Sequence, residues 1–440
     1  MFTINRKVFL ALFSLAISIP VCAKSIIDIQ TWNTTRGAKV LFTEVHELPI
    51  FDISVVFYAG SIADGKNYGL ANFTSSMLNA GTKNLTVDQI ADSFHYLGAL
   101  FYSYTGRDLS EVSLRCLAEP RILNPTLQTF GAVLNEPIFP EREINRMKEQ
   151  ILVAIEQKKQ YPQSIAFTEF YKELYQNFPY SHPIIGTAKT VTAINRQLLQ
   201  AFYRKYYTAR NALIIMVGDI TRNQAEEIAE KLTAKLPLGE KASIKEALLK
   251  KSKSLTKHLE FPSTQTNVLI GQLGVTRNDP DYFPLYIGNY ILGRPLFSDL
   301  FLEVREKLGL VYAINSSFIF YLYPGLFLIQ FSTSNAKVAK ALQITTKTLN
   351  NFIEKGPTAK QLSIAKKSLT NSFPFRLASN LLIKDALQTI GFYNLSLDYF
   401  DTYIAKINAV TLKDIQAAFK QHLARDKMLI IKVGQSSKPL

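Results

Sequence analysis

The order of strand and helix patterns along this chain occurs twice, on either side of a segment at 236–257 that is rich in Lys, Ser and turn residues. In the first half, alternating apolar residues predict strands, and apolar residues at helical spacing predict helices. The first half is expected to hold strands at 40–60, helices at 69–79 and 86–97, strands at 100–117 and helices at 125–160. The second half is expected to hold strands at 257–275, helices at 282–292 and 299–307, strands at 311–320 and 326–333, helices from 336 onward, a helix at 412–423 and a strand at 427–433.

This mix of strands and helices predicts an α+β protein in which helices pack on one face of a mostly antiparallel sheet, and the repeated order supports two related halves. A chain of 440 residues is too long for one simple core, so more than one domain is expected. We therefore predict an N-terminal domain at 24–235, a linker at 236–257 and a C-terminal domain at 258–440.

The first 23 residues have the pattern of a cleavable signal peptide. Arg6 and Lys7 precede an apolar run that is too short to cross a bilayer comfortably, and Val21 and Ala23 stand at the −3 and −1 positions of a cleavage site. Cys22 raises the alternative of a lipoprotein, but the residues before it match a lipobox poorly. We expect a periplasmic protein without a stable membrane span.

Charge and cysteine content exclude several classes of protein. The formal net charge is +15, but the basic residues are spread along the chain and form no basic helix with interleaved aromatic residues, so nucleic acid is not an expected partner. With the signal peptide removed, Cys116 is the sole cysteine, so no intramolecular disulfide is possible. A large core, rather than disulfide bonds, must hold the fold together.

The segment GLANFTSSML at 69–78 reads as an amphipathic helix after a turn at 64–67. It resembles the metal helix of the pitrilysin/insulinase family of zinc metallopeptidases, which carries H-x-x-E-H in a frame close to GLAHFLEHM. In that motif two His side chains hold zinc and the Glu serves as general base. The three positions here hold Asn72, Ser75 and Ser76, which neither bind zinc well nor accept a proton from water near neutral pH.

A second part of the resemblance is the predicted helix at 141–157. Glu149 and Glu156 are seven residues apart, so they lie on one helical face. Their spacing is similar to the paired glutamates of the family, of which the second supplies the third zinc ligand. One carboxylate alone does not hold zinc with useful affinity. The alternative is that both residues are solvated helix carboxylates.

The most specific part of the resemblance is REKLGLVYA at 305–313. Arg305 and Tyr312 match an Arg/Tyr pair that, in the family, reaches a peptide bound near zinc in the other half. A Tyr hydroxyl can donate to a developing oxyanion, and an Arg can anchor a carbonyl or carboxylate. In the alternative interpretation, Arg305 pairs on a helix surface with neighbouring glutamates, and Tyr312 begins a strand and belongs to the core.

The histidines offer little other chemistry. His182 precedes Pro183 in a loop-like stretch, where a structural hydrogen bond competes with a chemical role. The other four, His46, His95, His258 and His422, are scattered, and none stands at ligand spacing from another His or a Cys.

The resemblance covers nearly all of 24–440 and implies a non-catalytic subunit that is inactive alone. Its two halves would face each other across a peptide-holding cleft, with Arg305 and Tyr312 contacting the substrate in trans. The implied partner is a zinc-bearing homologous subunit in a heterodimer or larger complex, so zinc is expected there and not in this chain. Two alternatives stay open. One is a periplasmic peptide-binding scaffold that adds a peptide strand near 100–113, and the other is a stand-alone metalloprotease with an altered site.

Overall fold

The computed structural model describes residues 25–242, 249, 254–294 and 296–436. The predicted signal peptide at 1–23, including Cys22, lies outside the described residues, as do residues 243–248 and 250–253 of the predicted linker. Residues 255–257, which the sequence analysis assigns to the linker, form the start of a strand of the second half.

Six strands form the first sheet, in the order β1-β2-β6-β3-β5-β4. The β2–β6 pair is parallel and the other pairs are antiparallel. Strands β3 and β6 are apolar and buried along nearly their whole length, which suits their central places, whereas the edge strand β4 is largely exposed. The strands are β1 Gln30–Asn33, β2 Lys39–Glu44, β3 Ile50–Phe57, β4 Leu100–Thr105, β5 Ser110–Leu117 and β6 Ala212–Gly218.

Five strands form the second sheet, in the order β7-β11-β8-β10-β9. They are β7 Leu255–Glu260, β8 Gln265–Leu273, β9 Ile314–Ile319, β10 Leu326–Ser334 and β11 Leu429–Gly434. The β7–β11 pair is parallel, and the other pairs are antiparallel. When strands are counted from β2 and from β7, both sheets have the order first, fifth, second, fourth, third. The two halves are therefore related, and the predicted α+β class is confirmed.

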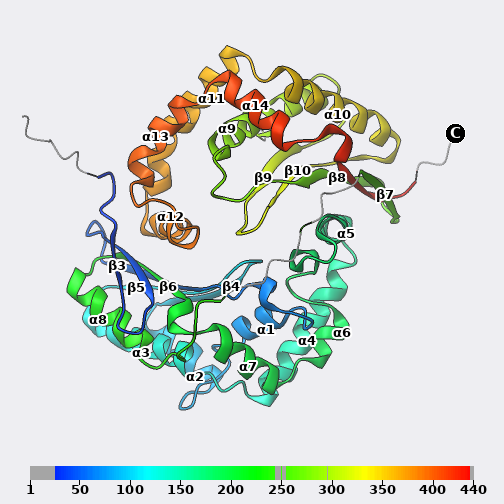
Figure 1. Ribbon diagram of the computed structural model, residues 1–440. Coiled ribbons are helices and arrows are strands. Elements are labelled where there is room, and N and C mark those ends of the chain that lie inside the picture. The colour runs from blue at the N-terminus through cyan, green and yellow to red at the C-terminus, as the bar shows by residue number, and fades with distance from the viewer. Residues whose placement is uncertain (1–24, 243–248, 250–253, 295, 437–440) are drawn as a thin grey trace, which may run out of the picture.

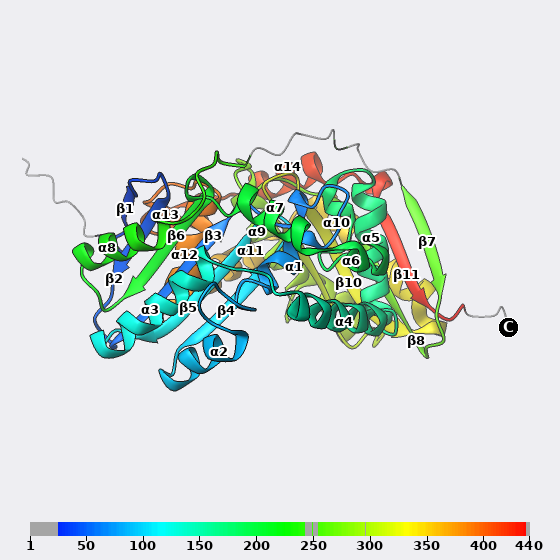
Figure 2. The same ribbon diagram turned by 90° about the horizontal axis from the view of Figure 1, so that it is seen from below.

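Most helices cover the outer faces of the two sheets, as Figure 2 shows for α1, α3 and α8 on the first sheet. Several of them begin with a Thr capping box, in which the Thr side chain and the residue three positions later bond each other's backbone N–H. The helices of the first half are α1 Leu70–Ser76, α2 Val87–Tyr96, α3 Pro120–Asn135, α4 Glu141–Lys158, α5 Pro162–Tyr175, α6 Ala188–Ala193, α7 Arg196–Tyr206 and α8 Arg222–Thr233. Those of the second half are α9 Tyr282–Gly293, α10 Val338–Lys355, α11 Ala359–Asn371, α12 Asn380–Phe392, α13 Tyr399–Ala409 and α14 Leu412–His422.

The two halves exchange one helix each (Figure 1). Helix α5 of the first half packs on β8 and β11 of the second sheet, and α12 of the second half packs on β3 and β6 of the first sheet. The Phe170 ring lies directly over Gly271, where an added Cβ would be 2.9 Å from Phe170 Cζ. In the same way, a Cβ on Gly391 would lie 2.7 Å from a methyl group of Leu41 and 2.8 Å from one of Leu213. Each half therefore completes the core of the other.

Candidate functional site

Asp64 defines the start of the helix that carries the altered zinc motif. Its carboxyl group is buried at the N-terminal end of α1 and accepts hydrogen bonds from the backbone N–H groups of Gly69 and Ala71, both at 2.7 Å. Such groups have no partner inside the helix. Burial raises the pKa of Asp64 to about 8, although the two backbone donors lower it. Asp64 is not among the site residues expected from the sequence, and the turn at 64–67 is the sequence signal that marks it.

Two glycines bring the loop before α6 against the start of α1. Both have left-handed backbone angles, with φ of +94° at Gly69 and +80° at Gly186. A Cβ on Gly69 would lie 2.7 Å from the Ile185 carbonyl oxygen, and one on Gly186 would lie 2.3 Å from that of Tyr68. Only glycine allows both this conformation and this approach.

This close approach places His182 beside α1. Its ring stacks on Tyr68 with the centroids 4.2 Å apart, and its Nδ1 lies 3.2 Å from the Pro183 carbonyl oxygen and 3.8 Å from Asp64 Oδ2. Burial lowers the pKa of His182 to about 4, so the imidazole is neutral at pH 7. These contacts favour the structural interpretation of His182. Its Nε2 is enclosed and has no hydrogen-bond partner among the described residues.

The three altered motif positions lie on α1 in two different environments. Asn72 and Ser76 are half-buried and one turn apart on the same face. Ser75, at the position of the general base, is only 2% exposed. Its hydroxyl faces that of Tyr207, whose pKa burial raises to about 12 while the Ser110 and Ser75 hydroxyls lower it. The side chain at position 75 therefore points into the packed interior of the first half.

The two glutamates on α4 point into solvent. Glu149 is exposed, and the side chain of Glu156 is 62% exposed and forms an ion pair with Lys159 at 2.7 Å. Within the described ranges, one group of three potential metal ligands occurs, and no residue of α1 or α4 belongs to it. The positions of both side chains therefore favour the interpretation that Glu149 and Glu156 are solvated helix carboxylates.

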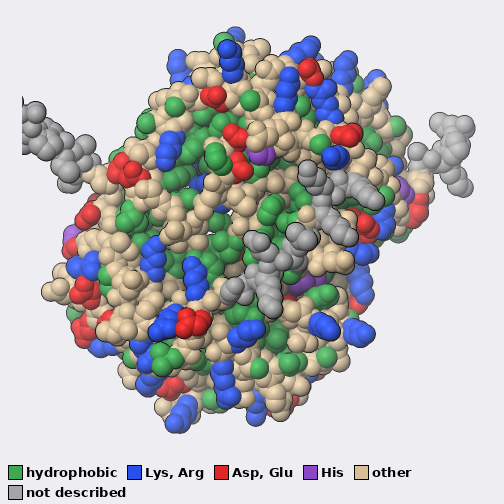
Figure 3. Space-filling model, viewed as in Figure 1, with side chains coloured by type: hydrophobic (Ala, Val, Ile, Leu, Met, Phe, Trp, Pro, Cys, Tyr) green, Lys and Arg blue, Asp and Glu red, His purple; other side chains and the backbone are tan. Residues whose placement is uncertain are grey.

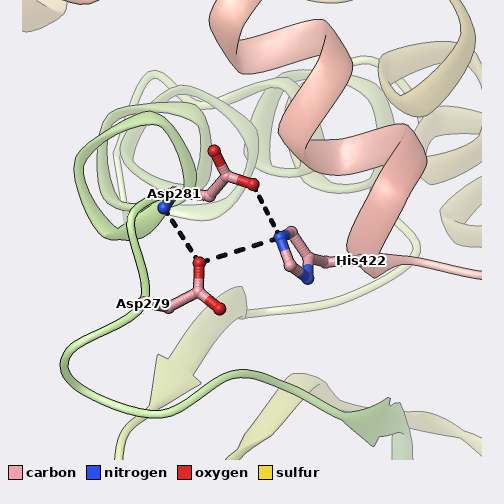
Figure 4. Close-up of side chains that lie close together, drawn as sticks. All are labelled: Asp279, Asp281 and His422. Carbon is pink, nitrogen blue, oxygen red and sulfur yellow. Dashed lines mark hydrogen bonds and ion pairs between the residues drawn. The ribbon is translucent and has the colours of Figure 1, made fainter.

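That one group joins two helices of the second half and comprises Asp279, Asp281 and His422 (Figure 4). His422 Nε2 lies 2.8 Å from Asp281 Oδ2 and 3.9 Å from Asp279 Oδ1, and Asp279 Oδ1 accepts the N–H of Asp281 at 2.9 Å. The carboxylates stand at the N-terminal end of α9 and the imidazole at the C-terminal end of α14, where the helix dipoles favour these charges. These contacts hold the start of α9 against the end of α14, and this structural role accounts for them.

Arg305 and Tyr312 lie together on the second half. Arg305 belongs to a π-helical turn, Phe301–Glu306, inside the predicted helix at 299–307. Its guanidinium carbon lies 4.7 Å from the Phe301 ring centroid and 5.6 Å from that of Tyr312. Arg305 Nη1 forms an ion pair with Glu306 Oε1 at 3.5 Å. The prediction of a strand from 311 is wrong for Tyr312, because β9 begins at Ile314. Tyr312 stands in a bend before the strand, where it is 87% exposed and is not a core residue.

A cleft of about 580 Å³ opens beside Tyr312, between the first turns of α5 and strands β8, β9 and β10. Amide and hydroxyl groups line its floor. Gln330 Nε2 donates to Asn315 at 3.2 Å, and the Ser332 hydroxyl donates to Asn267 at 2.8 Å. Gln330 Oε1 is enclosed and lacks a partner in the part of the chain that the structure describes. Such groups suit the N–H and C=O groups of a peptide.

Sequence comparison assigns the chain to a family. A profile described as insulinase (peptidase family M16) matches residues 39–188, and one described as peptidase M16 inactive domain matches residues 193–369. An uncharacterized zinc protease of Rickettsia bellii is 31% identical over 289 residues, which cover 65% of this chain and 68% of that protein. The chain belongs to the insulinase family of peptidases, M16.

Other M16 relatives extend the match. A protein of Helicobacter pylori described as a non-peptidase homolog, YmxG, is 26% identical over 392 residues, which cover 87% of this chain and 88% of that protein. The crystal structure described as a peptidase M16 inactive domain from Pseudomonas fluorescens superposes with a TM-score of 0.90 at 39% identity. The match covers 94% of this M16 chain and 100% of the chain in that crystal structure.

The surface of this M16 chain shows no single charged patch on the face in Figure 3, where Lys and Arg side chains are scattered between neutral ones. Within the described residues, no helix combines the length and apolar character that crossing a bilayer requires.

Proposed function

We propose that this chain is the non-catalytic subunit of a periplasmic zinc metallopeptidase complex, in which it binds and positions peptides for a zinc-bearing homologous partner. One contrast carries the proposal. The motif helix α1 presents Asn72 and Ser76 where imidazoles would be required, whereas Arg305 and Tyr312 remain together on the second half. The residues proposed to contact a substrate are thus present without the residues that activate water.

The exposure of Tyr312 supports a role in contacting another molecule. A tyrosine that is 87% exposed contributes little to its own fold, yet here it borders an amide-lined cleft and lies beside a guanidinium. In the complex, the hydroxyl of Tyr312 would donate to the oxyanion that develops at the scissile carbonyl, and Arg305 would hold a neighbouring carbonyl or carboxylate. Zinc and the general base would belong to the partner.

A periplasmic peptide-binding scaffold without a role in proteolysis is the second candidate, and strand β4 favours it. β4 is the last strand of its sheet, so its outer edge has no strand partner among the described residues. Leu100, Tyr102 and Tyr104 point from alternate positions of β4 and are 47%, 60% and 59% exposed. An extended peptide could add to this edge and pack on these side chains. The same edge would serve the subunit.

Co-purification from the native periplasm, with metal analysis of each chain, tests the first proposal. We expect a zinc-bearing homologue to elute with this chain, and an interface of about 2,000 Å² or more if the pair is obligate. The reconstituted pair should cleave unfolded peptides, and this chain alone should not. If the co-expressed chains elute separately at micromolar concentration while this chain still binds peptides, the scaffold function replaces the subunit function.

A further inference from the structure

Arg107 is a buried cation at the junction of the two halves. It lies in the hairpin between β4 and β5, and it is 8% exposed. One nitrogen, Nη1, donates to the carbonyl oxygens of Tyr180 at 2.5 Å and His182 at 3.1 Å. The guanidinium carbon lies 3.8 Å from the ring centroid of Tyr171. These contacts fix the plane of the guanidinium group.

Arg107 makes no ion pair in the described part of the chain, and the buried Asp108 carboxyl interacts with its charge only from beyond ion-pair distance. No described carboxylate oxygen lies within the ion-pair distance of 4.0 Å, and Nε and Nη2 have no described acceptor. The neighbouring Asp108 is engaged elsewhere, because it accepts the Tyr180 hydroxyl and the Leu322 N–H. A buried guanidinium without an ion-pair partner is costly, and its Nε–Nη2 edge has the geometry that binds a carboxylate with two hydrogen bonds.

Arg107 lines a pocket of about 310 Å³ whose described lining combines cations, hydroxyl groups and several apolar side chains and includes no carboxylate. Lys158, exposed at the end of α4, forms its other cationic wall and makes no ion pair with a described residue. Ser164 and Ser181 contribute hydroxyl groups, whereas the Thr168 hydroxyl already donates to the Ser164 carbonyl oxygen at 2.8 Å. The pocket therefore attracts a negatively charged group and offers donors to it.

The N-terminus of α5 adds to the same field. Gln163 and Ser164 belong to the first turn of this 14-residue helix, and both line the pocket. The N-cap residue, Tyr161, makes no side-chain cap, and the first backbone bond of the helix is donated by Ile165. The N–H groups of Gln163 and Ser164 are thus free of helix partners, and the helix dipole places partial positive charge beside Arg107.

Gln163 also lines the cleft beside Tyr312, so the two spaces adjoin at the start of α5. We infer that the pocket formed by Arg107, Lys158 and the N-terminus of α5 binds a carboxylate of the peptide held by this chain. This carboxylate pocket is small enough to take one acidic group with one or two residues. The inference rests on the proposed function in one respect, namely that the ligand is a peptide.

The test uses the full chain and three small probes: acetyl-dialanine with a free carboxylate, its C-terminal amide, and acetyl-Ala-Glu amide. Binding is measured by titration calorimetry at low salt. We expect the free acid or the Glu-containing amide to bind at least about tenfold more tightly than the dialanine amide, since a charge-assisted pair of bonds is lost in the latter. Preference between the two acidic probes distinguishes a C-terminal carboxylate from an acidic side chain. Equal affinity for all three would overturn the inference.

Variants assign the binding to this pocket. Lys158→Ala should weaken binding of the acidic probe several-fold. Lys159→Ala should not, because Lys159 is also exposed but pairs with Glu156 and does not line the pocket. Arg107→Lys keeps the charge and loses the two-point contact, so affinity should fall about tenfold or more. If Arg107→Lys lowers the melting temperature sharply, the Lys158/Lys159 comparison decides, and equal effects of these two variants reject the site.

These measurements need no partner subunit. If the acidic probes bind and respond to Lys158→Ala while the reconstituted pair fails to cleave peptides, the carboxylate pocket stands and the proposed function fails. If the pair cleaves peptides but acid and amide bind alike, the proposed function stands and the carboxylate pocket fails.

Discussion

The guanidinium of Arg305 lies 5.6 Å from the ring centroid of Tyr312, and Tyr312 lines a cleft between α5 of the first half and the second sheet. Arg305 comes from a π-helical turn and Tyr312 from the bend before β9. π-helical turns are frequent at functional sites. Tyr312 is almost fully exposed and the Arg305 side chain is 34% exposed, so changes at these two positions should leave folding nearly unchanged.

Tyr312→Phe should lower single-turnover cleavage by the reconstituted pair by about 10²–10³, the typical loss of one oxyanion donor. The melting temperature should stay within the error of measurement. Tyr96→Phe is the matched control, because Tyr96 is 82% exposed on α2. Arg305→Ala should also reduce turnover, and Arg305→Lys should restore it only in part. Wild-type turnover in Tyr312→Phe would leave this residue without a catalytic contribution.

Restoring the zinc motif should destabilise the chain. In the triple variant Asn72→His, Ser75→Glu and Ser76→His, the Glu must enter a site that is 2% exposed and faces Tyr207. Overpacking and an unpaired buried carboxylate should cost about 3 kcal/mol or more of unfolding free energy. Urea titration of the single variants checks this, and Ser76→Glu, at a half-buried position of the same helix, should cost much less. The unaltered chain should hold no zinc after dialysis.

His182 should make stability depend on pH between about 4 and 6.5. Burial lowers its pKa to about 4, so in this range the unfolded chain binds a proton that the folded chain does not. Stability from the neutral imidazole is therefore complete above pH 6.5 and is lost as the pH falls toward 4, by at most about 1.4 kcal/mol per pH unit.

The control for this prediction is the difference between wild type and His182→Gln, measured by urea unfolding at each pH. Asp64 lies 3.8 Å away, and its raised pKa gives the opposite slope, since the folded chain retains a proton that the unfolded chain loses as the pH rises toward 8. This contribution is largely shared by both proteins and cancels in the difference. A difference that does not change between pH 4.5 and 6.5 contradicts the assigned pKa.

The exchange of α5 and α12 should make the halves fold as one unit. Phe170→Ala, on a helix of the first half, removes a fully buried ring from the surface of β8 and should lower the unfolding free energy by about 3–5 kcal/mol. Phe375→Ala should change it little, because Phe375 is 73% exposed. Both should unfold in a single transition. Two separate transitions for the wild type, or a soluble folded first half expressed alone, would show that the exchange is not needed for stability.

Much of the fold and part of the candidate site follow from local patterns. The alternation at 40–60 and the spacing of Glu149 and Glu156 act over a few residues, so they can be recognised in the sequence. The replacement of the zinc motif by Asn72, Ser75 and Ser76 is likewise a matter of residue identity. These features predicted the family, the α+β class and two related halves.

Only the tertiary structure decided which side chains meet. Burial of Ser75, exposure of Tyr312 and the contact of Phe170 with Gly271 depend on how α1, β9 and α5 pack. Arg107 shows the reason most clearly. Its position in a hairpin tells nothing of its burial, which results when residues 73 and 75 positions further along the chain place their carbonyl oxygens against it. Packing over such separations is set by the sum of many weak contacts, and no local pattern records it.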